Sequence, residues 1–243
     1  MLPANLDTTI GVLLSGGLDS AILVGHLLGQ GRQVQPFYVR SHLVWEPCEL
    51  AATRHFLAAL ATPRLAPLAV FDMPVGDVYG DHWSLTGHGV PDAASLDTAV
   101  YLPGRNALLL LKPALWCRLH GIEHLALAVL GSNPFGDATP QFFAAMESVL
   151  AQATGGNVRL LRPFAELEKQ QVLALGRTLP LALTFSCIAP AGGLHCGQCN
   201  KCAERIAAFH AAGIPDPTVY AKEEGARMKD DGDVAVGVAL RNH

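Results

Sequence analysis

A six-residue loop at residues 15–20 constrains the fold of this chain more than any other feature. It reads Ser-Gly-Gly-Leu-Asp-Ser, follows an apolar run at residues 10–14, and leads into apolar residues at helical spacing from 21 to 28. The order is therefore strand, glycine loop and helix. Glycine tolerates the dihedral angles at which backbone N–H groups converge on an anion, and a helix N-terminus favours negative charge. The sequence predicts a phosphate-binding loop, and the simpler alternative is a tight strand-to-helix turn without a ligand.

The rest of the chain alternates between strand-like and helix-like segments, as expected of an α/β domain with a parallel sheet. A second strand at residues 34–39 would complete a strand–helix–strand unit. Further helices are expected at 49–60, 107–120, 166–176 and 203–212, further strands at 65–70 and 125–130, and an irregular segment at 74–96. We expect residues 1–180 to form the α/β domain, 181–221 a small C-terminal subdomain, and 222–243 a weakly ordered tail.

Composition and charge disfavour several classes of protein. The net charge is -4 and no run of Lys or Arg occurs, so nucleic acid is a disfavoured partner. The apolar stretches are broken before about 18 residues, and the start has no basic region followed by an apolar stretch. We therefore expect a cytoplasmic protein that does not enter the membrane. The apolar composition makes a homodimer plausible.

The cysteines gather near the C-terminus in a pattern typical of a metal site. Their order, with eight, two and two residues between them, is Cys187, Cys196, Cys199 and Cys202. Four soft ligands without a carboxylate favour a closed, structural Zn²⁺ site, in which His195 could replace one cysteine. An iron–sulfur cluster is the main alternative, and a redox pair or ordinary buried thiols are the others. Cys48 and Cys117 lie outside this pattern and are expected to be packing residues.

The Ser-Gly-Gly-Leu-Asp-Ser loop resembles the PP-loop of the ATP pyrophosphatase family, whose members cleave ATP between the α and β phosphates. No lysine follows the glycines, so the loop is not the Gly-Lys-Ser/Thr type. The resemblance implies an adenine nucleotide α-hydrolase-like fold, adenylate transfer, and ATP and Mg²⁺ as ligands. It implies that Asp19 helps to position Mg²⁺. The ATP-binding residues implied in this loop are Leu14, Ser15, Gly16, Gly17, Leu18, Asp19 and Ser20.

The loop and the cysteine motif together resemble the 7-cyano-7-deazaguanine synthase family. Residues 101–106, Tyr-Leu-Pro-Gly-Arg-Asn, are similar to the Pro-Gly-Arg-Asn segment of that family, and residues 163–176 to its Pro-x-x-x-Leu-x-Lys region. The resemblance implies a ligase that adenylates the carboxylate of 7-carboxy-7-deazaguanine and uses ammonia to form first an amide and then the nitrile, releasing AMP and pyrophosphate. It implies that Gly104 and Arg105 contact ATP, and that Asp19, Arg105 and Lys169 are catalytic.

The chain departs from that family where the second substrate is expected. Residues 38–42 keep only part of a Tyr-Gly-Gln-Arg-His-like stretch, and Gln171 stands where a glutamate is expected. Residues 131–140 read Gly-Ser-Asn-Pro-Phe-Gly-Asp-Ala-Thr-Pro in place of a Ser-Gly-Tyr-Pro-Asp segment. Here Asp137 is expected to take the carboxylate role and Phe135 to stack on a flat heterocycle, with Asn106 as a further substrate contact. The ATP chemistry is unaffected, and the identity of the heteroaromatic acid stays open.

Two other functions are compatible with the same motifs. A PP-loop enzyme can instead act on a tRNA base or a sulfur carrier, which would require a basic face or a second catalytic cysteine pair, and neither is evident. A zinc-stabilised module could also bind ATP without catalysis, although the intact Asp19 and Arg105 argue against it.

Overall fold

The protein is described by a computed structural model that covers residues 2–221, so the expected tail at 222–243 lies outside the described residues. Five parallel strands form one sheet in the order β3-β2-β1-β4-β5. They are β1 (Thr9–Leu14), β2 (Gln33–Arg40), β3 (Ala69–Asp72), β4 (His124–Ala126) and β5 (Arg159–Leu161). Since β2 and β4 flank β1 on opposite sides, the winding of the chain reverses at β1. In parallel α/β sheets, such a reversal opens a crevice at the carboxyl ends of the strands.

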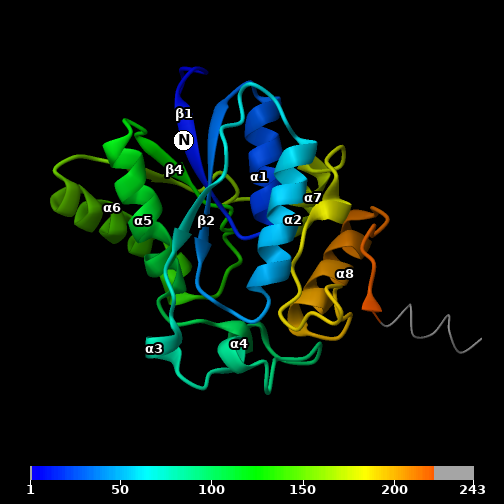
Figure 1. Ribbon diagram of the computed structural model, residues 1–243. Helices are drawn as coiled ribbons and strands as arrows, with labels where there is room; N and C mark the ends of the chain where they lie inside the picture. Colours follow the sequence, from blue (N-terminus) through cyan, green and yellow to red (C-terminus); the bar gives the residue numbers. More distant parts are fainter. Residues whose placement is uncertain (1, 222–243) are drawn as a thin grey trace, which may run out of the picture.

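Helices cover both faces of the sheet (Figure 1). One face carries α1 (Leu18–Gly29), α2 (Glu46–Ala59), α7 (Lys169–Leu175) and α8 (Asn200–Ala212), and the other carries α5 (Arg105–Leu119) and α6 (Pro140–Thr154). Single turns of helix occupy the connections: α3 (Gly76–Tyr79), α4 (Trp83–Thr86), η1 (Asp97–Val100), η2 (Gly136–Ala138) and η3 (Leu181–Leu183). Within residues 2–221 no helix is both long and apolar enough to cross a membrane.

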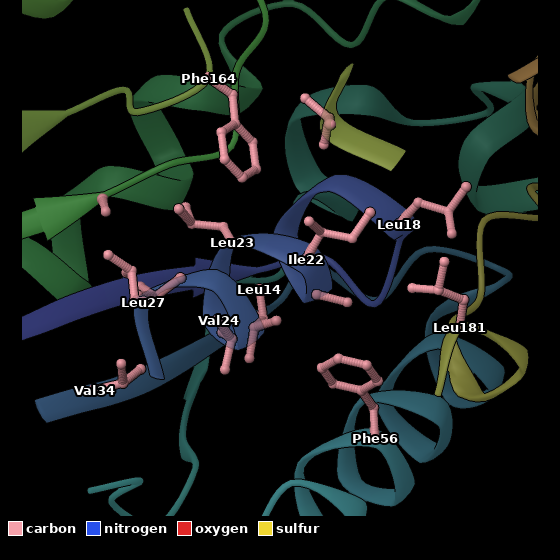
Figure 2. Close-up of a cluster of buried hydrophobic side chains, with 14 of the residues drawn as sticks. Leu14, Leu18, Ile22, Leu23, Val24, Leu27, Val34, Phe56, Phe164 and Leu181 are labelled. Carbon is pink, nitrogen blue, oxygen red and sulfur yellow. The ribbon is translucent and has the colours of Figure 1, made fainter. Parts of the chain in front are cut away.

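The alternation of side chains along β1 divides the core into two layers. Ile10, Val12 and Leu14 pack on the α1 side, where Figure 2 shows Leu14 among the side chains of α1 and Phe56 of α2. Leu13 points to the other layer, which contains the buried residues of α5 and α6. The strand is buried on both faces, which explains its continuous apolar run.

The sequence predicted most elements on the α1 side and missed two on the α6 side. The pattern did not reveal α6 or β5. The third strand begins at Ala69, four residues after the expected start, because Leu65 makes only an isolated bridge to Val34. The fourth strand ends at Ala126, well before residue 130. The segment at 74–96 is not wholly irregular, since it contains α3 and α4.

A third apolar cluster joins the cysteine-rich segment to the rest of the molecule. Cys187, Cys199 and Cys202 are buried in it together with Trp45 and Leu102, which come from distant parts of the chain. The segment that carries the cysteines has little regular structure before α8. Its position therefore depends on this cluster and on the polar contacts described below.

Candidate active site

A cavity of about 260 Å³ lies at the carboxyl end of β1, beside the N-termini of α1 and α5. Nine of the residues predicted for the site line it: Leu14, Ser15, Gly17, Leu18, Asp19, Ser20, Arg105, Asn106 and Lys169. Gly16, Gly104, Phe135 and Asp137 do not line it. The structure thus gathers residues from three distant motifs around one space.

The loop at residues 15–20 has the geometry of an anion cradle. Gly16 has a φ of +70°, a conformation that L side chains rarely adopt, and Gly17 is the N-cap of α1. The side chain of Ser20 turns back into the loop, where its Oγ accepts a hydrogen bond from the Ser15 backbone N–H at 3.1 Å. The N–H groups of the first turn of α1 have no partners within the helix and lie at the positive end of its dipole. This arrangement suits a phosphate group.

The ammonium group of Lys169 connects the loop with the cysteine-rich segment. Its Nζ lies 2.8 Å from Oδ2 of Asp19 and 3.1 Å from Oε1 of Glu204. Burial would lower the pKa of Lys169, but the carboxylates of Asp19 and Glu204 outweigh that effect and raise it. Burial would likewise raise the pKa of Glu204, yet Lys169 and Lys201 hold it at about 2. Lys169 and Glu204 are therefore both charged at neutral pH.

Two polar atoms at the cavity are buried and have no hydrogen-bond partner among the described residues. They are Oδ1 of Asp19 and Nε of Arg105. An unpaired buried donor or acceptor costs roughly 1–3 kcal/mol. A cation at Asp19 and an oxyanion at Arg105 would satisfy them, and these are the groups that Mg²⁺ and a phosphate or carboxylate would present.

The residues predicted to contact the second substrate lie at or next to the N-terminus of α5. Oδ2 of Asp137 accepts a hydrogen bond from the backbone N–H of Asn106 at 3.1 Å, and the Asn106 amide donates to the Asp137 carbonyl at 2.9 Å. The ring of Phe135 packs on Tyr101 with centroids 4.9 Å apart. In this conformation Asp137 holds the N-terminus of α5, on which Arg105 and Asn106 enter the cavity. A direct contact of Asp137 or Phe135 with a substrate stays a prediction.

The four cysteines converge as the spacing predicted. All four Sγ atoms lie within 4.8 Å of one another. The Sγ atoms of Cys187 and Cys199 are 3.9 Å apart, and those of Cys196 and Cys202 are 4.0 Å apart. Thiolates around one tetrahedral zinc ion, with Zn–S bonds of about 2.3 Å, are separated by roughly 3.8 Å. The set therefore fits a single soft metal ion.

His195 does not join this set, although it precedes Cys196. Its Nε2 accepts a hydrogen bond from the Ser186 backbone N–H at 3.1 Å, so this nitrogen carries no proton. It faces Ser186, which lines the cavity, and not the cysteines. Burial and the nearby Arg205 lower the pKa of His195 to about 4. The neutral ring thus fixes the backbone of residue 186, and the four thiolates complete the set of metal ligands.

Arg205 extends this support from α8. The side chain is 2 % exposed. Its guanidinium donates to Oγ1 of Thr184 at 2.9 Å, to Oγ of Ser186 at 3.2 Å and to the carbonyl of Leu181 at 3.1 Å. Between these partners, the Phe185 N–H donates to the carbonyl of Gly16 at 2.7 Å. Helix α8 is therefore linked to the glycine loop through residues 181–186, which are hydrogen-bonded to Arg205 and to Gly16.

Comparison with known proteins identifies the family of this chain. A family model described as queuosine biosynthesis protein QueC matches residues 9–213. The chain belongs to the QueC family. Three relatives named 7-cyano-7-deazaguanine synthase cover nearly the whole chain: those of Paracoccus denitrificans (36% identical, 86% of this chain and 91% of the relative), Ruegeria sp. (34%, 86% and 92%) and Rhizobium leguminosarum bv. trifolii (34%, 88% and 92%).

A solved structure supports the assignment of the fold. The U34-tRNA thiolase NcsA from Methanococcus maripaludis, described with its [4Fe-4S] cluster, superposes with a TM-score of 0.50 at 11% identity, over 98% of this chain and 77% of that one. The expected parallel-sheet PP-loop fold with a C-terminal cysteine cluster that can hold a metal ion is confirmed. Because the identity is low, this likeness carries no information on the substrate.

The sequence did not reveal four charged side chains at the cavity: Glu49, Lys201, Glu204 and Arg205. Each is a single charged residue on an amphipathic helix, where a solvated position is the ordinary expectation. The burial of Arg205 depends on contacts between α8 and residues about twenty positions earlier. The one local signal is the position of Glu204 and Arg205, two and three residues after the last cysteine of the motif.

Proposed function

We propose that this chain is a 7-cyano-7-deazaguanine synthase: an ATP-dependent ligase that adenylates the carboxylate of 7-carboxy-7-deazaguanine and uses ammonia to form the amide and then the nitrile. The family membership and the names of the relatives support this proposal. The single observation that carries it is the meeting of the loop, Asp19, Lys169 and Arg105 around one cavity. ATP would leave as AMP and pyrophosphate.

The proposed roles follow from charge and position. The loop amides and the hydroxyls of Ser15 and Ser20 would bind the pyrophosphate that leaves, and Lys169 would neutralise its charge. The second oxygen of Asp19, which has no partner among the described residues, would hold Mg²⁺, and the ion would offset negative charge on the phosphates. Arg105, with its free Nε, would orient the carboxylate or the α-phosphate in a fixed plane. Asn106, Asp137 and Phe135 would lie at the acceptor end, with Gly104 supporting the turn before Arg105.

We propose zinc as the metal of the cysteine set and residues 181–221 as the unit that it stabilises, apart from an ATP-binding unit at 1–180. The short Sγ–Sγ separations favour one ion, because a [4Fe-4S] cluster binds each thiolate to a different iron atom and holds the sulfurs farther apart. No carboxylate takes part, which suits a closed structural site. The test is metal analysis of purified protein, with about one zinc per chain expected; iron with labile sulfide would contradict the assignment.

The decisive experiment is an incubation of the protein with ATP, Mg²⁺, ammonium and 7-carboxy-7-deazaguanine, followed by mass spectrometry of the products. AMP, pyrophosphate, the amide and the nitrile are expected. AMP without amide or nitrile would point to another heteroaromatic acid, for which the changes at residues 131–140 leave room. Binding of ATP without AMP release would contradict an enzymatic function. A homodimer, expected from composition, stays a prediction.

A further inference from the structure

Glu49 is a buried carboxyl at the cavity for which the sequence motifs give no role. It lies in the first turn of α2 and is 9 % exposed. Its Oε2 accepts a hydrogen bond of 2.6 Å from the hydroxyl of Tyr38, and its other oxygen accepts none from the described residues. The side chain lines the cavity directly beside the glycine loop, since a Cβ built on Gly16 would meet Glu49 Cγ at 2.5 Å.

Glu49 differs from the other cavity carboxyls in its charge environment. Asp19 and Glu204 are both ion-paired with Lys169, whereas among residues 2–221 no cation lies within 4.0 Å of Glu49. Burial raises the pKa of Glu49 to about 7. The charged groups that face it act in both directions: Arg105 and the Tyr38 hydroxyl lower the pKa, and Glu46 raises it. A carboxyl of this kind changes its protonation near neutral pH, where a general base works best.

We propose that Glu49 is the general base that takes the proton from the ammonia nitrogen when it attacks the adenylated carboxylate. This inference rests on the proposed function. The lone pair of ammonia forms the C–N bond, and the C–O bond to AMP breaks with its electrons leaving on the phosphate. The nitrogen releases one proton to the Glu49 carboxylate, which becomes a neutral carboxylic acid. The acyl adenylate and ammonia are converted to the amide and AMP, with the proton returned to solvent.

The position of Glu49 suits this role better than that of its neighbours. Glu204 is held as an anion by Lys169 and Lys201, and a carboxylate with a strongly stabilised charge is a weak base, whereas Asp19 is already ion-paired with Lys169. Glu49 is buried next to Trp45, which also lines the cavity and is 3 % exposed. Little of the base would therefore be exposed to bulk solvent.

The test separates adenylation from amide formation in Glu49→Gln. Pyrophosphate exchange into ATP, measured with the carboxylic acid and without ammonia, should stay within about threefold of the unaltered chain, because this half-reaction needs no base. Amide formation with ammonium at pH 7 should fall by about 10²–10⁴-fold. Hydroxylamine, a weaker base that is already unprotonated at neutral pH, should restore much of the rate. Equal loss of exchange and amide formation, or no loss of either, would overturn the inference.

Tyr38→Phe provides a second test that keeps the carboxyl. Loss of the hydroxyl removes a hydrogen bond that favours the charged carboxylate, so the acid limb of the amide-forming rate should move to higher pH. Glu46→Gln is the matched control. Glu46 is also a buried carboxyl of α2, but it pairs with Arg40 and does not line the cavity; its removal takes away a like charge, so the acid limb should move to lower pH, opposite to Tyr38→Phe. An unmoved limb in Tyr38→Phe would contradict the assignment.

Failure of the proposed function and failure of the inference about Glu49 would give different results. If the unaltered chain makes neither acyl adenylate nor amide from 7-carboxy-7-deazaguanine, the proposed function fails. If it makes both, and Glu49→Gln retains the rate and the pH profile of amide formation, only the inference about Glu49 fails.

Discussion

The glycine loop and the cysteine cluster are built in opposite ways. The loop is held by the sheet: it follows a strand that is buried on both faces and begins a helix packed in the main core. The cysteine segment has little regular structure before α8, and it is held by a small apolar cluster and by four cysteine Sγ atoms that converge on one point. The first site is preformed by the fold, whereas we expect the second to depend on a bound metal ion.

The largest expected effect tests this dependence on the metal. Cys199→Ser removes one of the four thiolates, so we expect loss of the bound metal and a fall in the melting temperature of many degrees, since metal binding in such sites contributes on the order of 10 kcal/mol. Metal analysis and thermal unfolding measure both. Cys48→Ser, which changes a cysteine outside the set, should keep the metal. If Cys199→Ser melted as the unaltered protein does, the segment would not need its ligand.

A change in the glycine loop should have the opposite effect: the activity should fall, and the stability of the fold should change little. Asp19→Asn removes the charge expected to hold Mg²⁺ and the partner of Lys169, so the rate of AMP formation should fall by about 10²–10³-fold with little change in melting temperature. Glu204→Gln removes the other partner of Lys169 and leaves the loop intact, so its loss should be far smaller. Similar losses in the two variants would show that the position of Lys169 matters, rather than the Asp19 carboxylate.

Arg205→Met tests whether the two regions depend on each other. The change leaves the hydroxyls of Thr184 and Ser186 without their donor, and the carbonyl of Leu181 with only the hydrogen bond from Thr184, in a largely buried position. We expect destabilisation of roughly 3 kcal/mol and a higher KM for ATP, because the same segment is hydrogen-bonded to Gly16. Arg159→Met, at an exposed pair with Glu147, is the control. An unchanged KM in Arg205→Met would mean that the loop does not need the cysteine helix.

The contrast also explains how much could be predicted from the sequence. The loop and the cysteines are contiguous motifs, and their residue types and spacings are set by local geometry, so both were placed correctly. Arg205, Glu204 and Glu49 reach the cavity through the packing of α2 and α8, and the only local signal is the nearness of Glu204 and Arg205 to the last cysteine of the motif. Asp137 was expected at the substrate; in this structure it binds the N-terminus of α5, an interaction between residues 31 positions apart, and its contact with a substrate stays a prediction. Strand β5 was missed because it is only three residues long. Helix α6 was missed although Thr139 and Pro140 at its start and Gly155 at its end are typical helix boundary residues.

Within the loop, the two glycines should differ. In Gly16→Ala the residue would keep a φ near +70° and its Cβ would meet Glu49 Cγ at 2.5 Å, so we expect a loss of about 3 kcal/mol in the free energy of unfolding. Gly17→Ala adds a Cβ with no atom closer than 3.6 Å, at a φ of -73°, and should cost less than about 1 kcal/mol. Chemical denaturation measures both. Equal costs would show that the loop conformation is less fixed by its surroundings than the sheet implies.

The smallest expected effect concerns the pH dependence of stability at Glu49. Its pKa is raised from 4.5 to about 7 in the folded state, so the folded protein binds a proton more tightly there than the unfolded chain does. The stability linked to this proton is fully present below pH 4.5 and is lost as the pH rises to about 7. Glu49→Gln has no titrating carboxyl at this position, so its stability does not fall in this way as the pH rises. The variant should therefore gain stability relative to the unaltered chain between pH 4.5 and 7, by about 3 kcal/mol, with no further change above that range. Denaturation curves of the two proteins across this interval measure the difference. A constant difference would mean that the Glu49 carboxyl is already ionised throughout this range.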